Sequence, residues 1–207
     1  LEGTPYAATF HGNSEHLALG ENWVRVERLY ELGFTVFTFD YRGYGRSEGE
    51  PSYDGILIDG LAAVAHIESE LRAARGDGWT MDRVVLHGLS LGGGVALHTA
   101  AEIDPLCVIT EDTYANPDTL LEAAAGGLAL PPGWFFESPF DNTRAVRRVD
   151  VPLLIMHGAA DDYIPPVNAA VLFDAANEPK EKWLVAGADH AQTPTIDPDG
   201  YAAHILN

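Results

Sequence analysis

A serine between glycines is the strongest chemical signal in the sequence. Gly88–Gly92 has the pattern G-x-S-x-G, follows the apolar run Val84–Leu89 and opens a stretch of small residues. Between a strand and a helix, glycines two positions before and after a serine relieve the crowding of a tight turn. Such a turn places Ser90 at a helix start, where the Leu91 amide and the helix dipole favour developing negative charge. The pattern predicts a nucleophilic serine. The alternative is a serine that only caps the helix.

A serine hydroxyl becomes a good nucleophile only beside a base and an orienting acid. Among the eight histidines, His190 is the predicted base because it lies in a glycine-containing loop after the last apolar run, near the end of the chain. Asp161 is the predicted acid because it closely follows the apolar run Leu153–His157, and functional loops gather at the carboxyl ends of parallel strands. The reserve choice for the acid is Asp162, and a weaker alternative is Asp112.

Short apolar runs alternate with helical patterns along the whole chain, which is typical of a parallel sheet flanked by helices. The sequence therefore predicts an α/β fold with a mostly parallel central sheet and one domain over residues 1–207. The expected strands are Tyr6–Phe10, Phe34–Phe39, Val84–Leu89, Leu106–Thr110, Leu153–His157 and Trp183–Val185. The expected helices are Trp23–Leu32, Ile56–Arg75, Gly92–Glu102, Val167–Asn177 and Tyr201–Leu206.

Residues 113–148 interrupt this alternation and are expected to form a short lid-like excursion over one sheet edge. Its apolar residues are candidates for lining an acyl pocket, although apolar residues in such a segment are more often plain packing. These pocket candidates are Leu128, Leu130, Trp134, Phe135 and Phe136.

The charge composition of the chain limits the kinds of molecule that it is expected to bind. The 31 acidic residues against 12 basic ones give a net charge of −19, and only two of the basic residues are lysines. Such a surface repels phosphate backbones and anionic lipids, so we expect neither nucleic acid binding nor membrane contact from this chain. The acidity is typical of a well-solvated surface, and the scarcity of lysine raises the further hypothesis of adaptation to high salt. The single cysteine, Cys107, leaves the compartment open; a cytoplasmic location is favoured, and a removed N-terminal signal or anchor stays an alternative.

Five spaced motifs together resemble the α/β-hydrolase fold, in particular the serine hydrolases of the BEM46-like and serine-aminopeptidase-like branch. The order Ser90, Asp161, His190 is the order of that fold. The remaining matches are His11-Gly12-Asn13, the D-x-R-G-x-G-x-S segment at 40–47, His157-Gly158-Ala159-Ala160-Asp161 and Gly187-Ala188-Asp189-His190. The resemblance covers essentially the whole chain.

The resemblance implies a Ser-His-Asp triad that cleaves a small-molecule carboxylic ester of small to medium acyl length through an acyl-enzyme. It also implies that the amides of Asn13 and Leu91 bind the oxyanion and that no metal or organic cofactor takes part. A peptidase or thioesterase with the same triad is the alternative enzyme, and a hydrolase-like binding protein with an impaired site is the alternative outside enzymes.

The resemblance also exposes one departure. The first two strands of the fold should precede His11, yet only ten residues do, so these strands are expected to be missing or trimmed. The exposed sheet edge that results would invite pairing with another chain, which predicts a homodimer through that edge.

Overall fold

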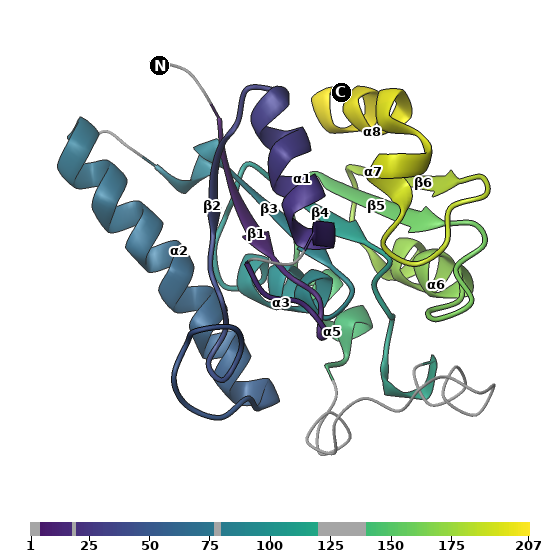
Figure 1. Cartoon of the computed structure of the whole chain (residues 1–207), viewed down its shortest axis with the longest axis horizontal. Helices are drawn as coiled ribbons and strands as arrows, with labels where there is room; N and C mark the ends of the chain where they lie inside the picture. The colour runs from purple at the N-terminus through teal and green to yellow at the C-terminus, as the bar shows by residue number, and fades with distance from the viewer. Residues whose placement is uncertain (1–4, 18–19, 77–79, 120–139) are drawn as a thin grey trace.

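A parallel sheet forms the centre of the protein. The computed structural model describes residues 5–17, 20–76, 80–119 and 140–207. Its strands are β1 (Tyr6–Phe10), β2 (Thr35–Thr38), β3 (Val84–Leu89), β4 (Cys107–Glu111), β5 (Leu153–Gly158) and β6 (Lys180–Val185). They lie in the order β2-β1-β3-β4-β5-β6, and every neighbouring pair is parallel (Figure 1). All carboxyl ends therefore meet at one edge of the sheet, which confirms the predicted fold class.

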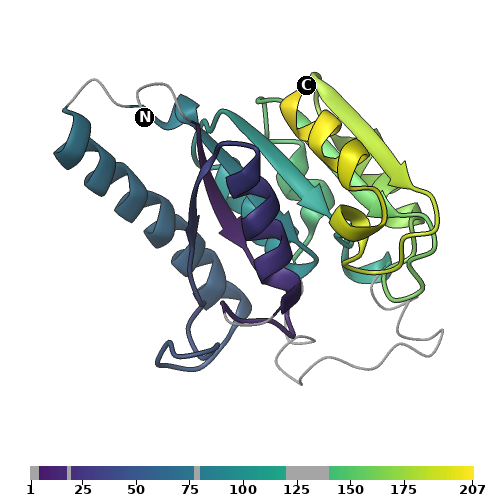
Figure 2. The same ribbon diagram turned by 45° about the horizontal axis from the view of Figure 1, so that its top comes forward.

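Helices cover both faces of the sheet. The α-helices with described bounds are α1 (Gly20–Glu31), α2 (Tyr53–Arg75), α3 (Leu91–Ala100), α5 (Asn142–Val146), α6 (Val167–Ala175), α7 (Thr193–Ile196) and α8 (Pro198–Leu206), and a short 3-10 helix spans Met81–Arg83. Figures 1 and 2 show α1, α7 and α8 on one face and the other helices on the opposite face. The long helix α2 begins where the Ser52 hydroxyl accepts a hydrogen bond from the Gly55 amide, and it ends at Gly76, whose φ of 89° suits glycine.

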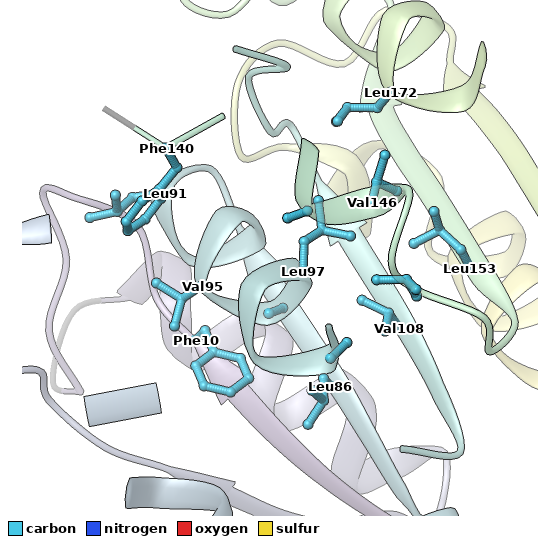
Figure 3. Close-up of a cluster of buried hydrophobic side chains, with 14 of the residues drawn as sticks. Phe10, Leu86, Leu91, Val95, Leu97, Val108, Phe140, Val146, Leu153 and Leu172 are labelled. Atoms are coloured by element: carbon cyan, nitrogen blue, oxygen red, sulfur yellow. The ribbon is translucent and has the colours of Figure 1, made fainter. Parts of the chain in front are cut away.

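Strand residues alternate between two hydrophobic layers because successive side chains point to opposite faces of a sheet. In β3, Val84 and Leu86 join the larger layer with α2, α3, α5 and α6, whereas Val85 joins the smaller layer with α1 and α8. Figure 3 shows part of the larger layer, where Val95 and Leu97 of α3 lie over the sheet. Burial on both faces explains why the central strands are continuous apolar runs in the sequence.

The two ends of the segment 113–148 pack against the body of the protein. Tyr114 and Ala115 are buried directly after β4, and α5 places Val146 in the core against α3 and α6. These ends belong to the packed body of the protein because their apolar side chains fill the space beside α3. The predicted pocket residues lie outside the described residues: Leu128, Leu130, Trp134, Phe135 and Phe136.

Strand β2 forms one edge of the sheet, with Thr35 exposed and the rest of the strand half-buried. An edge strand presents unpaired backbone groups on its outer side. The expected homodimer through this edge stays a prediction. Within the described part of the chain, no helix has the length and apolar character needed to cross a membrane.

Candidate active site

Ser90 occupies a sharp turn between β3 and α3. Its backbone has φ 54° and ψ −115°, a conformation that residues with a side chain rarely adopt. Only glycine fits on either side, because a Cβ at Gly88 would lie 2.2 Å from the Gly92 carbonyl oxygen and a Cβ at Gly92 would lie 2.0 Å from the Phe10 carbonyl oxygen. The Ser90 side chain makes no capping hydrogen bond to α3. The alternative of a simple helix cap is therefore wrong.

The predicted oxyanion residues flank this turn. Leu91 is the first residue of α3, so its amide is one of the donors that a helix start leaves without an intrahelical acceptor. Asn13 follows β1, the strand that neighbours β3. The Tyr44 hydroxyl donates a 2.6 Å hydrogen bond to Asn13 Oδ1, which fixes the orientation of that side chain.

The loop before Asn13 is held by its own side chains. The Gly12 amide donates to Glu15 Oε2 at 2.7 Å, and His11 Nδ1 donates to the Gly12 carbonyl at 2.8 Å. His11 is 1% exposed, so it supports the loop from inside the protein. Arg42 has a matching role in the next loop, where it binds Asp59 with a shortest contact of 2.7 Å. Both residues brace loops.

His190 and Asp161 are brought together from loops 29 residues apart. The Nδ1 atom of His190 lies 2.8 Å from Asp161 Oδ2. The other oxygen, Oδ1, accepts hydrogen bonds from the amides of Tyr163 and Ile164 at 2.9 and 2.7 Å. Asp161 is 3% exposed, whereas the reserve candidate Asp162 is exposed. The carboxylate that contacts the histidine is therefore Asp161.

This contact sets the charges of both partners. Burial alone would raise the pKa of Asp161, but hydrogen bonds from His157 and His190 and the charge of His190 outweigh burial and lower that pKa to about 2. Burial likewise favours neutral His190, yet the hydrogen bond to Asp161 and the charges of Asp161 and Asp112 raise the pKa of His190 above its ordinary value. Asp161 is thus ionised at neutral pH and stabilises a protonated imidazole.

Ser90 and His190 are linked through the end of β4, which lies between their strands. The Ser90 amide donates to the Glu111 carbonyl at 2.8 Å. The next residue, Asp112, accepts a 2.8 Å hydrogen bond at Oδ2 from the amide of Ala191. Serine, histidine and aspartate therefore follow strands that end at the same sheet edge, and hydrogen bonds through the end of β4 connect the serine turn with the histidine loop.

The site combines a strained serine between glycines with a buried carboxylate that contacts a histidine, in this order along a parallel sheet. These features agree with a sequence match to the Alpha/beta hydrolase family over residues 9–140. The chain belongs to this family. The family match spans more than half of the protein and includes Ser90, while Asp161 and His190 lie beyond it.

Relatives of this alpha/beta hydrolase include YfhR of Escherichia coli strain K12, an uncharacterized protein that is 32% identical over 184 residues, with 87% of this chain and 61% of YfhR covered. The chain thus spans less than two thirds of that relative. Among solved structures, the esterase Pf2001 of Pyrococcus furiosus has a TM-score of 0.80 at 19% identity, covering 100% of this chain and 82% of its own. Est1E of Butyrivibrio proteoclasticus, solved with ferulic acid bound, has a TM-score of 0.76 at 18% identity, covering 100% and 90%. These two structures share the fold.

The sequence did not predict the buried ion pair that contacts the histidine loop. Arg25 of α1 binds Glu111 through two hydrogen bonds of 2.8 and 2.6 Å, and both side chains are buried. Arg25 also donates to the Ala191 carbonyl at 2.9 Å. The partners are 86 residues apart, and the only hint in the sequence is an arginine among the apolar positions of α1.

Asp112 is buried but is not the acid of the triad. Its Oδ1 accepts from the Gly158 amide at 2.7 Å and its Oδ2 accepts from the Ala191 amide, so it holds the backbone of both loops and not the imidazole. The weaker alternative for the acid is therefore wrong, because both oxygens are committed to amide donors. Burial, together with the charge of Glu111, raises the pKa of Asp112.

One group of described residues has the spacing of metal ligands, namely Asp112, His157 and Asp161, whose ligand atoms lie within 4.8 Å of one another. Each of their four carboxylate oxygens already accepts a hydrogen bond, and His157 Nε2 donates to the Ile164 carbonyl at 2.7 Å. These contacts form a hydrogen-bond network that supports the acid.

Proposed function

We propose that this alpha/beta hydrolase is a serine hydrolase that cleaves carboxylic esters of small to medium acyl chains through an acyl-enzyme. The observation that carries the proposal is the 2.8 Å contact between His190 and a buried Asp161 on the sheet edge that also carries the strained Ser90. In this arrangement the imidazole is oriented for proton transfer and the hydroxyl stands at a helix start.

In the proposed reaction, Ser90 Oγ attacks the acyl carbonyl while His190 Nε2 takes the hydroxyl proton. Asp161 fixes the imidazole with its proton on Nδ1 and stabilises the imidazolium that forms. The amides of Leu91 and Asn13 bind the oxyanion, and each such donor lowers the barrier by about 3 kcal/mol. His190 then protonates the leaving alcohol. Water attacks the acyl-enzyme with His190 as base, which releases the acid and restores the serine.

The experiment is a panel of p-nitrophenyl esters from acetate to decanoate, with a feruloyl ester added because the fold neighbour Est1E holds ferulic acid. Aminoacyl anilides and acyl thioesters run in parallel. A fluorophosphonate that labels the active serine counts the competent sites. Ser90→Ala is the matched variant, because it removes one oxygen and leaves the turn glycines in place.

We expect ester turnover that falls with long acyl chains and is abolished, together with labelling, by Ser90→Ala. Faster turnover of anilides or thioesters would replace the esterase proposal by a peptidase or thioesterase with the same triad. A folded protein with no turnover on any panel and no labelling would contradict the enzyme and favour a hydrolase-like binding protein.

A further inference from the structure

Strained backbone in this protein is concentrated beside the proposed active site. Among the described residues, the non-glycine residues with positive φ are Ser90 at 54°, Asp112 at 49° and Ala191 at 63°. Such conformations persist only where surrounding contacts enforce them. The tight turn between β3 and α3 explains the positive φ of Ser90. The other two are Asp112, at the end of β4, and Ala191, the neighbour of His190, and they contact each other.

Ala191 is held at both ends of its backbone. Its amide donates to Asp112 Oδ2 at 2.8 Å, and its carbonyl accepts from Arg25 Nη2 at 2.9 Å. Arg25 is in turn fixed by two hydrogen bonds to Glu111. The consecutive carboxylates Glu111 and Asp112 thus restrain the peptide groups on either side of one strained residue.

The same carboxylates tie this loop to the rest of the site. Asp112 Oδ1 accepts from the Gly158 amide in the segment that leads to Asp161, and the Asp112 amide donates to the Met156 carbonyl at 3.1 Å. Glu111 also bonds the Thr193 hydroxyl at the start of α7. These residues are buried, so their hydrogen bonds are shielded from competition with water.

We propose that Glu111, Asp112 and Arg25 form a clamp that positions His190, by holding Ala191 in a left-handed conformation and fixing the histidine loop relative to the acid loop. Asp112 is a positioning residue that acts through the backbone and does not touch substrate. The clamp rests on the proposed function, in which His190 is the base.

The clamp predicts a specific pattern for Asp112→Asn. Asparagine tolerates positive φ, so the backbone at 112 is retained. The Gly158 and Ala191 amides bind different oxygens of Asp112, and asparagine replaces one of these oxygens with an NH2 donor, so only one of the two amides keeps its acceptor. The freed loop misplaces His190, and misplacement by about 1 Å lowers kcat by about 100-fold. We therefore expect kcat per labelled site to fall by about 10- to 100-fold, while KM changes little.

The pH profile gives a second readout. The groups that face His190 are Asp161 after β5, Asp112 after β4, His157 in β5 and the ring of Tyr163, whose centroid lies 4.9 Å away. Removing the charge of Asp112 lowers the pKa of His190, because that charge helps to raise it. The acid limb of kcat/KM should accordingly move to lower pH in Asp112→Asn.

The experiment compares wild type, Asp112→Asn, Asp112→Asn with Ala191→Gly, and Asp141→Asn. The last is a matched control, because Asp141 also accepts a backbone amide, that of Arg144, but at the start of α5. Ester kcat is measured per fluorophosphonate-labelled site. The Ala191 amide exchange rate and the His190 titration are measured by NMR, which needs no turnover.

We expect Asp112→Asn to lower kcat, to speed Ala191 amide exchange at least about 10-fold and to lower the pKa of His190. Ala191→Gly should restore part of kcat, because glycine adopts positive φ without the clamp. Unchanged exchange and unchanged kcat per site would overturn the clamp, as would a loss confined to the number of labelled sites. A wild type that hydrolyses no ester refutes the proposed function instead, and the NMR measurements still decide the clamp.

Discussion

Replacing Asp161 by asparagine should trap His190 in the wrong tautomer. Asp161 Oδ1 accepts two backbone amides, whereas Oδ2 lies 2.8 Å from His190 Nδ1 and 3.4 Å from His157 Nε2. The single oxygen of an amide is expected to remain with the two backbone donors, which turns its NH2 group toward His190. That group can only donate, so Nδ1 must accept and the imidazole proton moves to Nε2. Nε2 then cannot take the Ser90 proton.

Asp161→Asn should lower kcat strongly and the free energy of unfolding moderately. A triad with its histidine in the wrong tautomer loses about 10⁴ in kcat, or about 5 kcal/mol of transition-state stabilisation. Lowering the pKa of Asp161 from 3.8 to about 2 corresponds to about 2 kcal/mol of folding free energy at neutral pH. Because the folded pKa is depressed, this contribution is present above pH 4 and is lost as pH falls toward 2. The wild type and the variant should therefore converge in stability near pH 2.

The assay is kcat per labelled site for the best ester of the panel, with urea unfolding at pH 7 and pH 3. Asp162→Asn is the matched control, since it makes the same change at the neighbouring exposed carboxylate. We expect Asp161→Asn to lose activity and Asp162→Asn to keep it. An Asp161→Asn enzyme within about 10-fold of wild type, or a larger loss in Asp162→Asn, would refute the assignment of the acid.

Four further outcomes are expected. Tyr44→Phe removes the 2.6 Å hydrogen bond to Asn13 and should lower kcat by about 5-fold at constant KM. An unchanged kcat would show that catalysis does not depend on the orientation of the Asn13 side chain. Gly92→Ala places a Cβ 2.0 Å from the Phe10 carbonyl oxygen and should lose about 3 kcal/mol in urea unfolding, whereas Gly33→Ala meets no atom within 4 Å and should lose only about 1 kcal/mol from strain. With a net charge of −19, the Tm should rise from low to molar NaCl, and a flat response would end the hypothesis of salt adaptation. Pairing through β2 should give concentration-dependent sedimentation that Thr35→Lys weakens, and a monomer at every concentration would argue against it.

The sequence predicted most of the sheet because the central strands are apolar on both faces. The ranges Tyr6–Phe10 and Val84–Leu89 match β1 and β3 to the residue. Strand β6 is longer than predicted because its first half is Lys180-Glu181-Lys182, whose partly exposed side chains hide the strand from a search for apolar runs. Helices α5 and α7 were missed because they span only five and four residues, too few to show a helical period.

Site residues that depend on neighbouring sequence could likewise be predicted, whereas those that depend on contacts between distant segments could not. Ser90 could be predicted because the turn that strains it is encoded in five consecutive residues. Asp161 was preferred to Asp162 from the sequence, but only in the fold do burial and the contact with His190 distinguish these two neighbouring carboxylates. The pair Arg25–Glu111 was not predictable, because a buried ion pair is recognisable only once both partners are placed.

The end of β4 emerges as the part that sets the geometry of the whole site. The Glu111 carbonyl accepts a hydrogen bond from the Ser90 amide, and the Glu111 carboxylate binds Arg25. One residue therefore contacts both the turn that holds the serine and the arginine that holds the histidine loop. Because β4 is hydrogen-bonded to β3 on one side and β5 on the other, its register fixes where the serine and the acid stand relative to each other. A one-residue slip of β4 would turn Glu111 to the other face of the sheet and break both contacts at once. The burial of Glu111, which is costly for a lone carboxylate, is therefore offset by Arg25 and serves the alignment of the reacting groups.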